Sequence, residues 1–148
     1  MKRNTIEKML KFLEAKENKE IPDKWFDSLP KYNLVKELEN HPDGIQYRYE
    51  GKLDLVNTSI TKLPNDLYVE AGLELNDCVK LIKLPDNLHV GGDLNLFNCR
   101  KITELPNKLY VGGLFIIFKT PLANKYTDEQ IYEIVASTGG EIGGKIIK

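Results

Sequence analysis

The sequence predicts an α/β solenoid, in which short parallel strands stack along one axis between helical ends. The first observation is a repeat, because Leu63-Pro64, Leu84-Pro85 and Leu105-Pro106 lie 21 residues apart. The second is a pair of apolar residues at alternate positions, once in each repeat, which is the pattern of a half-buried strand. The third is helical periodicity before and after the repeats. A fixed period in the twenties is typical of solenoids, whose units pack only on their neighbours.

Composition limits the functions that need to be considered. The chain has 148 residues, about one domain, and its 21 basic and 22 acidic residues nearly cancel, whereas nucleic-acid partners usually require a basic face. No run approaches the roughly 18 apolar residues of a membrane helix. The start, Met1 to Asn4, is basic but has no apolar signal core, so export is not indicated. Two cysteines are too few for a disulfide scaffold, and we expect a cytoplasmic protein without nucleic-acid or membrane partners.

The N-terminal third predicts short helices. Asn4 and Glu7 form a capping-box pattern, and the apolar spacing that follows predicts a helix over residues 5–16. A second short helix would carry Trp25 and Phe26, and a third would carry Leu34, Val35 and Leu38. Helices this short need a partner for their apolar faces, so we expect residues 1–44 to form an N-terminal helical cap on the solenoid of residues 45–148. The alternative is that Trp25 and Phe26 form a docking site.

The repeats begin with a predicted strand over residues 45–55, where apolar and polar residues alternate. Each repeat has two apolar residues at inward strand positions. A small residue with a short polar group follows three residues after the second of them. We expect these small residues to form a buried ladder that bonds the backbone of the turning loop. The inward pairs are Leu53/Leu55, Leu73/Leu75, Leu94/Leu96 and Phe115/Ile117, and the ladder is Thr58, Cys78 and Cys99.

The strand segments Leu75-Asn76-Asp77-Cys78 and Leu94-Asn95-Leu96-Phe97-Asn98-Cys99 resemble the L-x-L-x-x-N/C segment of the leucine-rich-repeat family. The Leu-Pro step and the period are similar to short bacterial repeats of secreted effector ligases. The pattern I-T-x-L-P-x-x-L-x-V-G-G-x-L-x-L is similar to small repeat proteins of phages and their bacterial hosts. The resemblance covers residues 49–118 and implies a leucine-rich-repeat-like stack that binds another protein. It departs where Val90 precedes Leu94 by four residues rather than three, and it implies no ligase activity.

The C-terminal end predicts a longer last rung. Thr127 and Gln130 form a second capping-box pattern and open a helix with Ile131, Ile134 and Val135 on one side. Ile142-Gly143-Gly144-Lys145-Ile146 then repeats the corner and strand start of residues 90–94. We therefore expect a helix-containing rung and a final strand. Lys148 falls on the inward phase, so this strand is expected to fray.

The sequence shows no recognisable catalytic or metal-binding signature. The two histidines, His41 and His89, have no cysteine or histidine at metal-ligand spacing. Cys78 and Cys99 fall on neighbouring rungs, close enough for a disulfide, although two buried free thiols are the simpler interpretation. No phosphate-binding loop and no nucleophile with a matching base is recognisable. We therefore expect a non-enzymatic protein without a cofactor.

Two surface features are the candidate sites. The first is the outward face of the strands, which changes from acidic and polar to apolar along the axis and suggests a protein-binding surface. Its residues are Asp54, Glu74, Asn95, Ile116, Phe97, Leu114 and Phe118. Two further interpretations stay open: the helix near Ile131 could fold over the apolar part, or a homodimer could form through it.

The second feature is an outward column of Tyr68, His89 and Tyr110. Aromatic side chains at rung spacing form a rigid ridge of a kind favoured at binding sites, but surface stacking alone could also explain them. The leading hypothesis is a protein-interaction module, phage-derived and acting on a host protein. The alternatives are a small-molecule or nucleotide binder that uses this ridge, and a structural subunit of a larger assembly.

Overall fold

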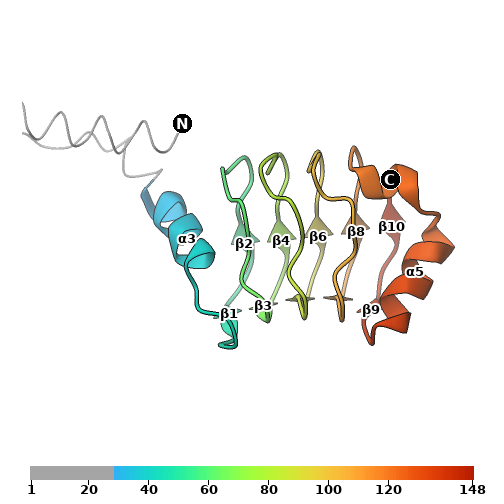
Figure 1. Cartoon of the computed structure of the whole chain (residues 1–148), viewed down its shortest axis with the longest axis horizontal. Coiled ribbons are helices and arrows are strands. Elements are labelled where there is room, and N and C mark those ends of the chain that lie inside the picture. The colour runs from blue at the N-terminus through green and yellow to red at the C-terminus, as the bar shows by residue number, and fades with distance from the viewer. Residues whose placement is uncertain (1–28) are drawn as a thin grey trace, which may run out of the picture. The chain divides into compact units, whose positions relative to one another are not determined.

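The computed structural model describes residues 29–148 (Figure 1). The predicted helix over residues 5–16 and the segment of Trp25 and Phe26 lie outside these residues. The chain divides into two compact units, residues 1–37 and residues 38–148, and the cap assigned to residues 1–44 stays a prediction. Helix α3, Leu29–Glu39, spans the boundary and corresponds to the helix predicted around Leu34, Val35 and Leu38.

Residues 38–148 contain a solenoid of stacked short parallel strands, as the repeat predicted, and these strands form two sheets rather than one (Figure 1). Each rung contributes one short strand to each sheet, and every pairing is parallel. The odd-numbered sheet has the order β1-β3-β5-β7-β9, and the even-numbered sheet β10-β8-β6-β4-β2. The strands are β1 Tyr47–Tyr49, β3 Leu67–Val69, β5 His89–Val90, β7 Tyr110–Val111 and β9 Glu141–Ile142, and β2 Leu53–Asp54, β4 Leu73–Glu74, β6 Leu94–Asn95, β8 Phe115–Ile116 and β10 Ile146–Ile147.

The prediction of one strand over residues 45–55 is wrong. The chain forms β1 and β2 in different sheets, and a corner separates them at Gly51, whose φ is +79°. Alternation continues through such a corner, so it cannot distinguish one long strand from two short ones. Ile45 lies before β1 and is exposed rather than inward.

The inward residues form continuous apolar columns between the two sheets. Leu53 pairs with Leu73, Leu73 with Leu94, and Leu94 with Phe115. Their side chains are fully buried, and so are the second inward members of these four rungs. The odd-numbered sheet faces them with buried columns of its own. These columns are Leu67, Leu88 and Leu109, and Val69, Val90, Val111 and Ile142.

The double-glycine corners are explained by the spacing between rungs. A Cβ on Gly91 would lie 2.1 Å from the Glu70 carbonyl oxygen, and one on Gly112 would lie 2.2 Å from that of Gly91. Glycine is therefore required here by the close approach of the preceding rung rather than by an unusual φ. The register pairs Val69 with Val90, so Glu70-Ala71 is the equivalent of Gly91-Gly92 one rung earlier.

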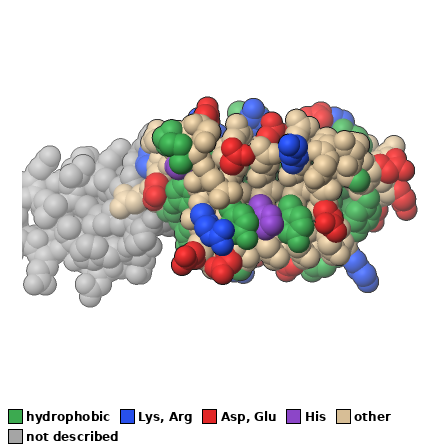
Figure 2. All heavy atoms as spheres, turned by 90° about the horizontal axis from the view of Figure 1, so that it is seen from below, with side chains coloured by type: hydrophobic (Ala, Val, Ile, Leu, Met, Phe, Trp, Pro, Cys, Tyr) green, Lys and Arg blue, Asp and Glu red, His purple; other side chains and the backbone are tan. Residues whose placement is uncertain are grey.

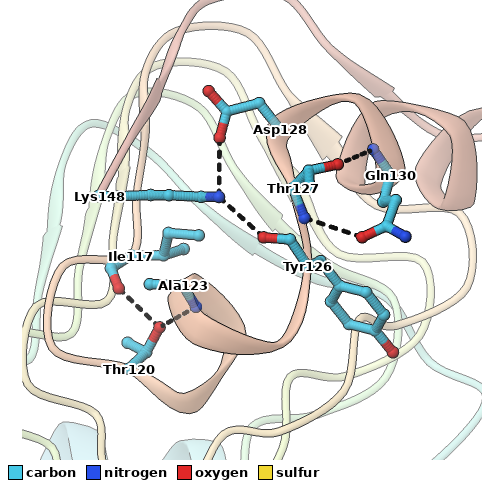
Figure 3. Close-up of polar contacts among 8 residues, drawn as sticks. All are labelled: Ile117, Thr120, Ala123, Tyr126, Thr127, Asp128, Gln130 and Lys148. Carbon is cyan, nitrogen blue, oxygen red and sulfur yellow. Dashed lines mark hydrogen bonds and ion pairs between the residues drawn. The ribbon is translucent and has the colours of Figure 1, made fainter.

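The last rung contains two helices, α4 (Pro121–Lys125) and α5 (Asp128–Ser137). Thr127 caps α5 with the reciprocal hydrogen bonds to Gln130 that the sequence predicted (Figure 3). Helix α4 was not predicted, since a proline that ends an extended arc can equally occupy the first turn of a helix.

Lys148, from which fraying of the final strand was predicted, lies just beyond β10 (Ile146–Ile147) and makes polar contacts. Its Nζ donates to the Tyr126 carbonyl oxygen at 2.8 Å and lies 3.0 Å from Asp128 Oδ1 (Figure 3). These contacts join the chain end to the segment between α4 and α5. Lys148 is exposed rather than inward, and its flexible stem lets the ammonium group reach these polar partners.

Candidate functional site

The outer face of the even-numbered sheet carries the predicted gradient from acidic to apolar. The register places Asp54 beside Glu74, Glu74 beside Asn95, and Asn95 beside Ile116. Lys52 forms an ion pair with Glu74 at 3.1 Å. The acidic end is thus partly neutralised, whereas the residues that follow along the column are polar and then apolar.

The apolar end forms a contiguous surface that we name the apolar patch. Phe97 and Phe118 stack with their ring centroids 5.7 Å apart, and Ile147 pairs beside Ile116. Phe118 is 46% exposed and Ile147 is 40% exposed. The patch comprises Phe97, Leu114, Ile116, Phe118 and Ile147. Ile147 was not placed in the patch by sequence analysis. The signal that could have placed it is the segment from Gly143 to Ile146, which sets the register of the last strand.

Helix α5 does not cover the apolar patch as a whole. It buries Ile131 and Val135 and lies at the C-terminal end of the solenoid, beyond β9 and β10 (Figure 1). Tyr132 of this helix donates through its hydroxyl to the Gly144 carbonyl oxygen at 2.8 Å, near the start of β10. The exposure of Phe118 and Ile147 therefore excludes the interpretation in which this helix seals the patch.

An open basic depression of about 570 Å³ lies beside the apolar patch. Lys119 belongs to both, because its Nζ lies 5.6 Å from the Phe97 ring centroid and 5.9 Å from that of Phe118. The depression is lined by Arg100, Lys119, Thr120, Pro121, Asn124 and Lys125. Sequence reasoning missed this cluster, because its basic residues come from two rungs and from α4.

Lys119 has a backbone conformation that usually favours other residues. Its φ is +59°, and the equivalent positions of the preceding rungs also have positive φ but carry asparagine or aspartate. Short polar side chains tolerate this left-handed region better than a lysine does. The equivalent residues are Asn57, Asp77 and Asn98. A lysine replaces them at the edge of the apolar patch.

The predicted column of Tyr68, His89 and Tyr110 forms a continuous aromatic stack on the odd-numbered sheet. Each neighbouring pair has ring centroids 4.3 Å apart and an interplanar angle of 7°. The Arg48 guanidinium lies 4.2 Å from the Tyr68 ring centroid, and Glu141 follows Tyr110 in the register. Figure 2 shows this row on the surface, with a basic side chain at one end and an acidic one at the other.

The stack leaves little ring face for a ligand. Both faces of His89 are covered by tyrosines, and Arg48 covers the outer face of Tyr68. Burial, with the Arg48 charge as a second cause, holds the pKa of His89 below its ordinary value of 6.5. A nucleobase or sugar that stacks needs an open ring face, and this arrangement offers mainly ring edges.

The predicted ladder of Thr58, Cys78 and Cys99 is buried as expected and extends to Thr120, but its thiols bond the backbone of the preceding rung rather than their own turning loop. Both thiols are free and buried. Cys78 Sγ donates to the Leu55 carbonyl oxygen at 3.0 Å, and Cys99 Sγ donates likewise to Leu75. Burial, followed by the neighbouring Cys78, raises the pKa of Cys99 to about 12. Burial and the hydrogen bonds between rungs indicate a structural ladder, and a thiol with a raised pKa is a poor nucleophile.

Within residues 29–148, no group of three or more His, Cys, Asp or Glu side chains is placed to hold a metal ion. Over the same residues, no helix combines the length and apolar character needed to cross a membrane.

No protein-family model matches the chain, and neither the curated proteins nor the solved structures gave a significant match. The resemblance to leucine-rich repeats thus stays a prediction.

Proposed function

We propose that this chain is a non-enzymatic protein-interaction module that binds its partner through the apolar patch. The observation that carries the proposal is the exposure of Phe118 and Ile147 next to Phe97 and Ile116 on a sheet with a fully buried core. Contiguous exposed apolar surface is typical of interaction sites. A rigid sheet also presents these side chains with little loss of conformational freedom on binding.

The resemblance to small phage and bacterial repeat proteins suggests the biological setting. We propose that the partner is a host protein that the chain engages or inhibits, and that binding occurs in the cytoplasm. The two free buried cysteines support a reducing compartment. The acidic end of the face, at Asp54 and Glu74, and the polar Asn95 next to it would contact the partner at the periphery and contribute mainly to specificity.

The test is affinity capture from the native host with Phe118→Asp plus Ile147→Asp, both exposed positions of the patch. We expect this double variant to lose the captured partner while its thermal unfolding matches that of the parent protein. Ile82→Asp is the matched control, because Ile82 is 61% exposed and lies outside the patch. Unchanged capture by the double variant, or equal loss with the control, would contradict the assignment.

A second candidate function, binding of a nucleotide or small molecule, rests on Tyr68, His89 and Tyr110. Their mutual stacking supports a role in holding neighbouring rungs together, worth a fraction of a kcal/mol up to about 1 per pair. A thermal-shift screen with nucleotides tests this candidate, because a ligand that binds only the folded state raises the unfolding temperature.

Sedimentation velocity tests whether the chain forms a homodimer or joins a larger assembly.

A further inference from the structure

We infer that the apolar patch recognises an acidic segment of its partner, in which carboxylates lie close to a large apolar side chain. This inference rests on the proposed function and adds the chemistry of the partner. The apolar side chain would contact Phe118 and Ile147, and the carboxylates would lie over the basic depression beside them. Lys119 connects the two parts, because it contacts both aromatic rings and lines the depression.

The charges of the depression favour a negatively charged occupant. Arg100, Lys119 and Lys125 contribute three positive charges, and Glu104 is the carboxylate that contacts Lys125. Arg100 uses its Nε to donate to Asn98 Oδ1 at 2.9 Å, which orients the guanidinium and leaves its terminal nitrogens for another acceptor. Positive charge beside an apolar surface selects partners of complementary charge and speeds their association.

We assign the recognition of a carboxylate to side-chain donors of the depression. The Ala123 backbone N–H, in the first turn of α4, is already bonded to Thr120 Oγ1, and the Thr120 hydroxyl donates to the Ile117 carbonyl oxygen at 2.6 Å. The side-chain donors of Arg100 and Lys119 therefore provide the recognition. Arginine and lysine side chains pair readily with carboxylates on a partner surface.

Lys119 offers a substitution that separates binding from folding. Lys119→Asn restores the residue type found at the equivalent Asn57 and Asn98, where the backbone φ is also positive. The variant removes the charge and is expected to fold at least as stably as the parent. A loss of binding without a loss of stability would therefore report the charge itself rather than damage to the rung.

The experiment is a selection of random peptides displayed on phage against the full chain, followed by affinity measurement with the selected peptides. We expect enrichment of sequences with aspartate or glutamate close to an aromatic or aliphatic residue. Lys119→Asn and Arg100→Gln should each weaken binding about two- to fivefold, as expected for one exposed ion pair. Lys62→Asn, a change at an exposed lysine of the first rung, should leave the affinity unchanged, and added salt should weaken the parent more than the variants.

The outcomes separate this inference from the proposed function. The selected peptides could prove neutral or basic, bind more weakly to Phe118→Asp, and bind equally well to Lys119→Asn. That result would overturn the inference of an acidic partner segment and leave the patch as a binding surface. Peptides insensitive to Phe118→Asp would contradict the patch itself. A selection that enriches no peptide, or a homodimer in sedimentation velocity that Phe118→Asp dissociates, would also overturn the inference.

Discussion

Cys99 donates a hydrogen bond through its Sγ to the carbonyl oxygen of Leu75, one rung earlier, at 3.0 Å. Cys78 makes the same contact with Leu55. The bond joins two rungs through a side chain, in addition to the backbone pairing of the sheets. Cys99 lies just after the strand segment of its own rung, and Leu75 lies at the end of the neighbouring strand. The bond therefore connects the loop that begins at Cys99 to the end of that strand.

The first prediction concerns the reactivity of Cys99. Because burial raises its pKa to about 12, we expect no reaction with a disulfide reagent at neutral pH while the protein is folded. Reaction should follow unfolding by urea, and Thr103→Cys should supply an exposed thiol that reacts at once. Rapid modification of Cys99 in the folded protein would contradict the buried ladder.

The second prediction tests the inward register. Leu94→Ala removes a fully buried side chain between Leu73 and Phe115 and should lower the free energy of unfolding by about 2–5 kcal/mol. Urea denaturation measures this change. Lys80→Ala, at an exposed position, should stay within about 0.5 kcal/mol of the parent. A loss below about 1 kcal/mol for Leu94→Ala would mean that the side chain is not in the core.

The third prediction is a dependence of stability on pH that His89 controls. Its pKa is lowered in the folded state, chiefly by burial and also by Arg48, so the unfolded chain binds the proton more tightly. The contribution of His89 to stability is therefore complete above its ordinary pKa of 6.5 and is lost as the pH falls through the folded value.

Thermal unfolding between neutral and mildly acidic pH, with NMR titration of the His89 ring, measures this effect. His89→Gln should flatten that part of the profile, since glutamine does not titrate. Arg48→Gln should move the pKa of His89 upward because it removes the second cause of the shift. An NMR pKa for His89 above its ordinary value would contradict the prediction.

The fourth prediction concerns Asn76, whose Oδ1 is buried without a hydrogen-bond partner among the described residues. An unsatisfied buried acceptor is costly, so Asn76→Val, which matches Val56 at the equivalent position, should raise the free energy of unfolding by about 1 kcal/mol. Asn95→Val is the opposite control, since Asn95 Oδ1 accepts from the Phe97 backbone N–H at 3.0 Å. This control should lose about 0.5–1.5 kcal/mol.

The sequence by itself determined the solenoid, its inward columns and the order of its outward residues. A repeat determines these because each rung meets only its neighbours, so residues at equivalent positions must stack. The period was therefore sufficient to predict that Tyr68, His89 and Tyr110 share a column, and that Asp54, Glu74, Asn95 and Ile116 share another. It also predicted the buried thiols and the capped helix at Thr127.

Only the tertiary structure decided what lies between the repeats and at their ends. The corner at Gly51 divides one alternating segment into two strands, and Lys148 is exposed and contacts Tyr126 and Asp128 rather than pointing inward. The same is true of the candidate site, where Phe118 stays exposed and Lys119 joins the aromatic pair to Arg100. The physical reason is that exposure and charge clustering depend on contacts between rungs and helices, which no periodic pattern contains.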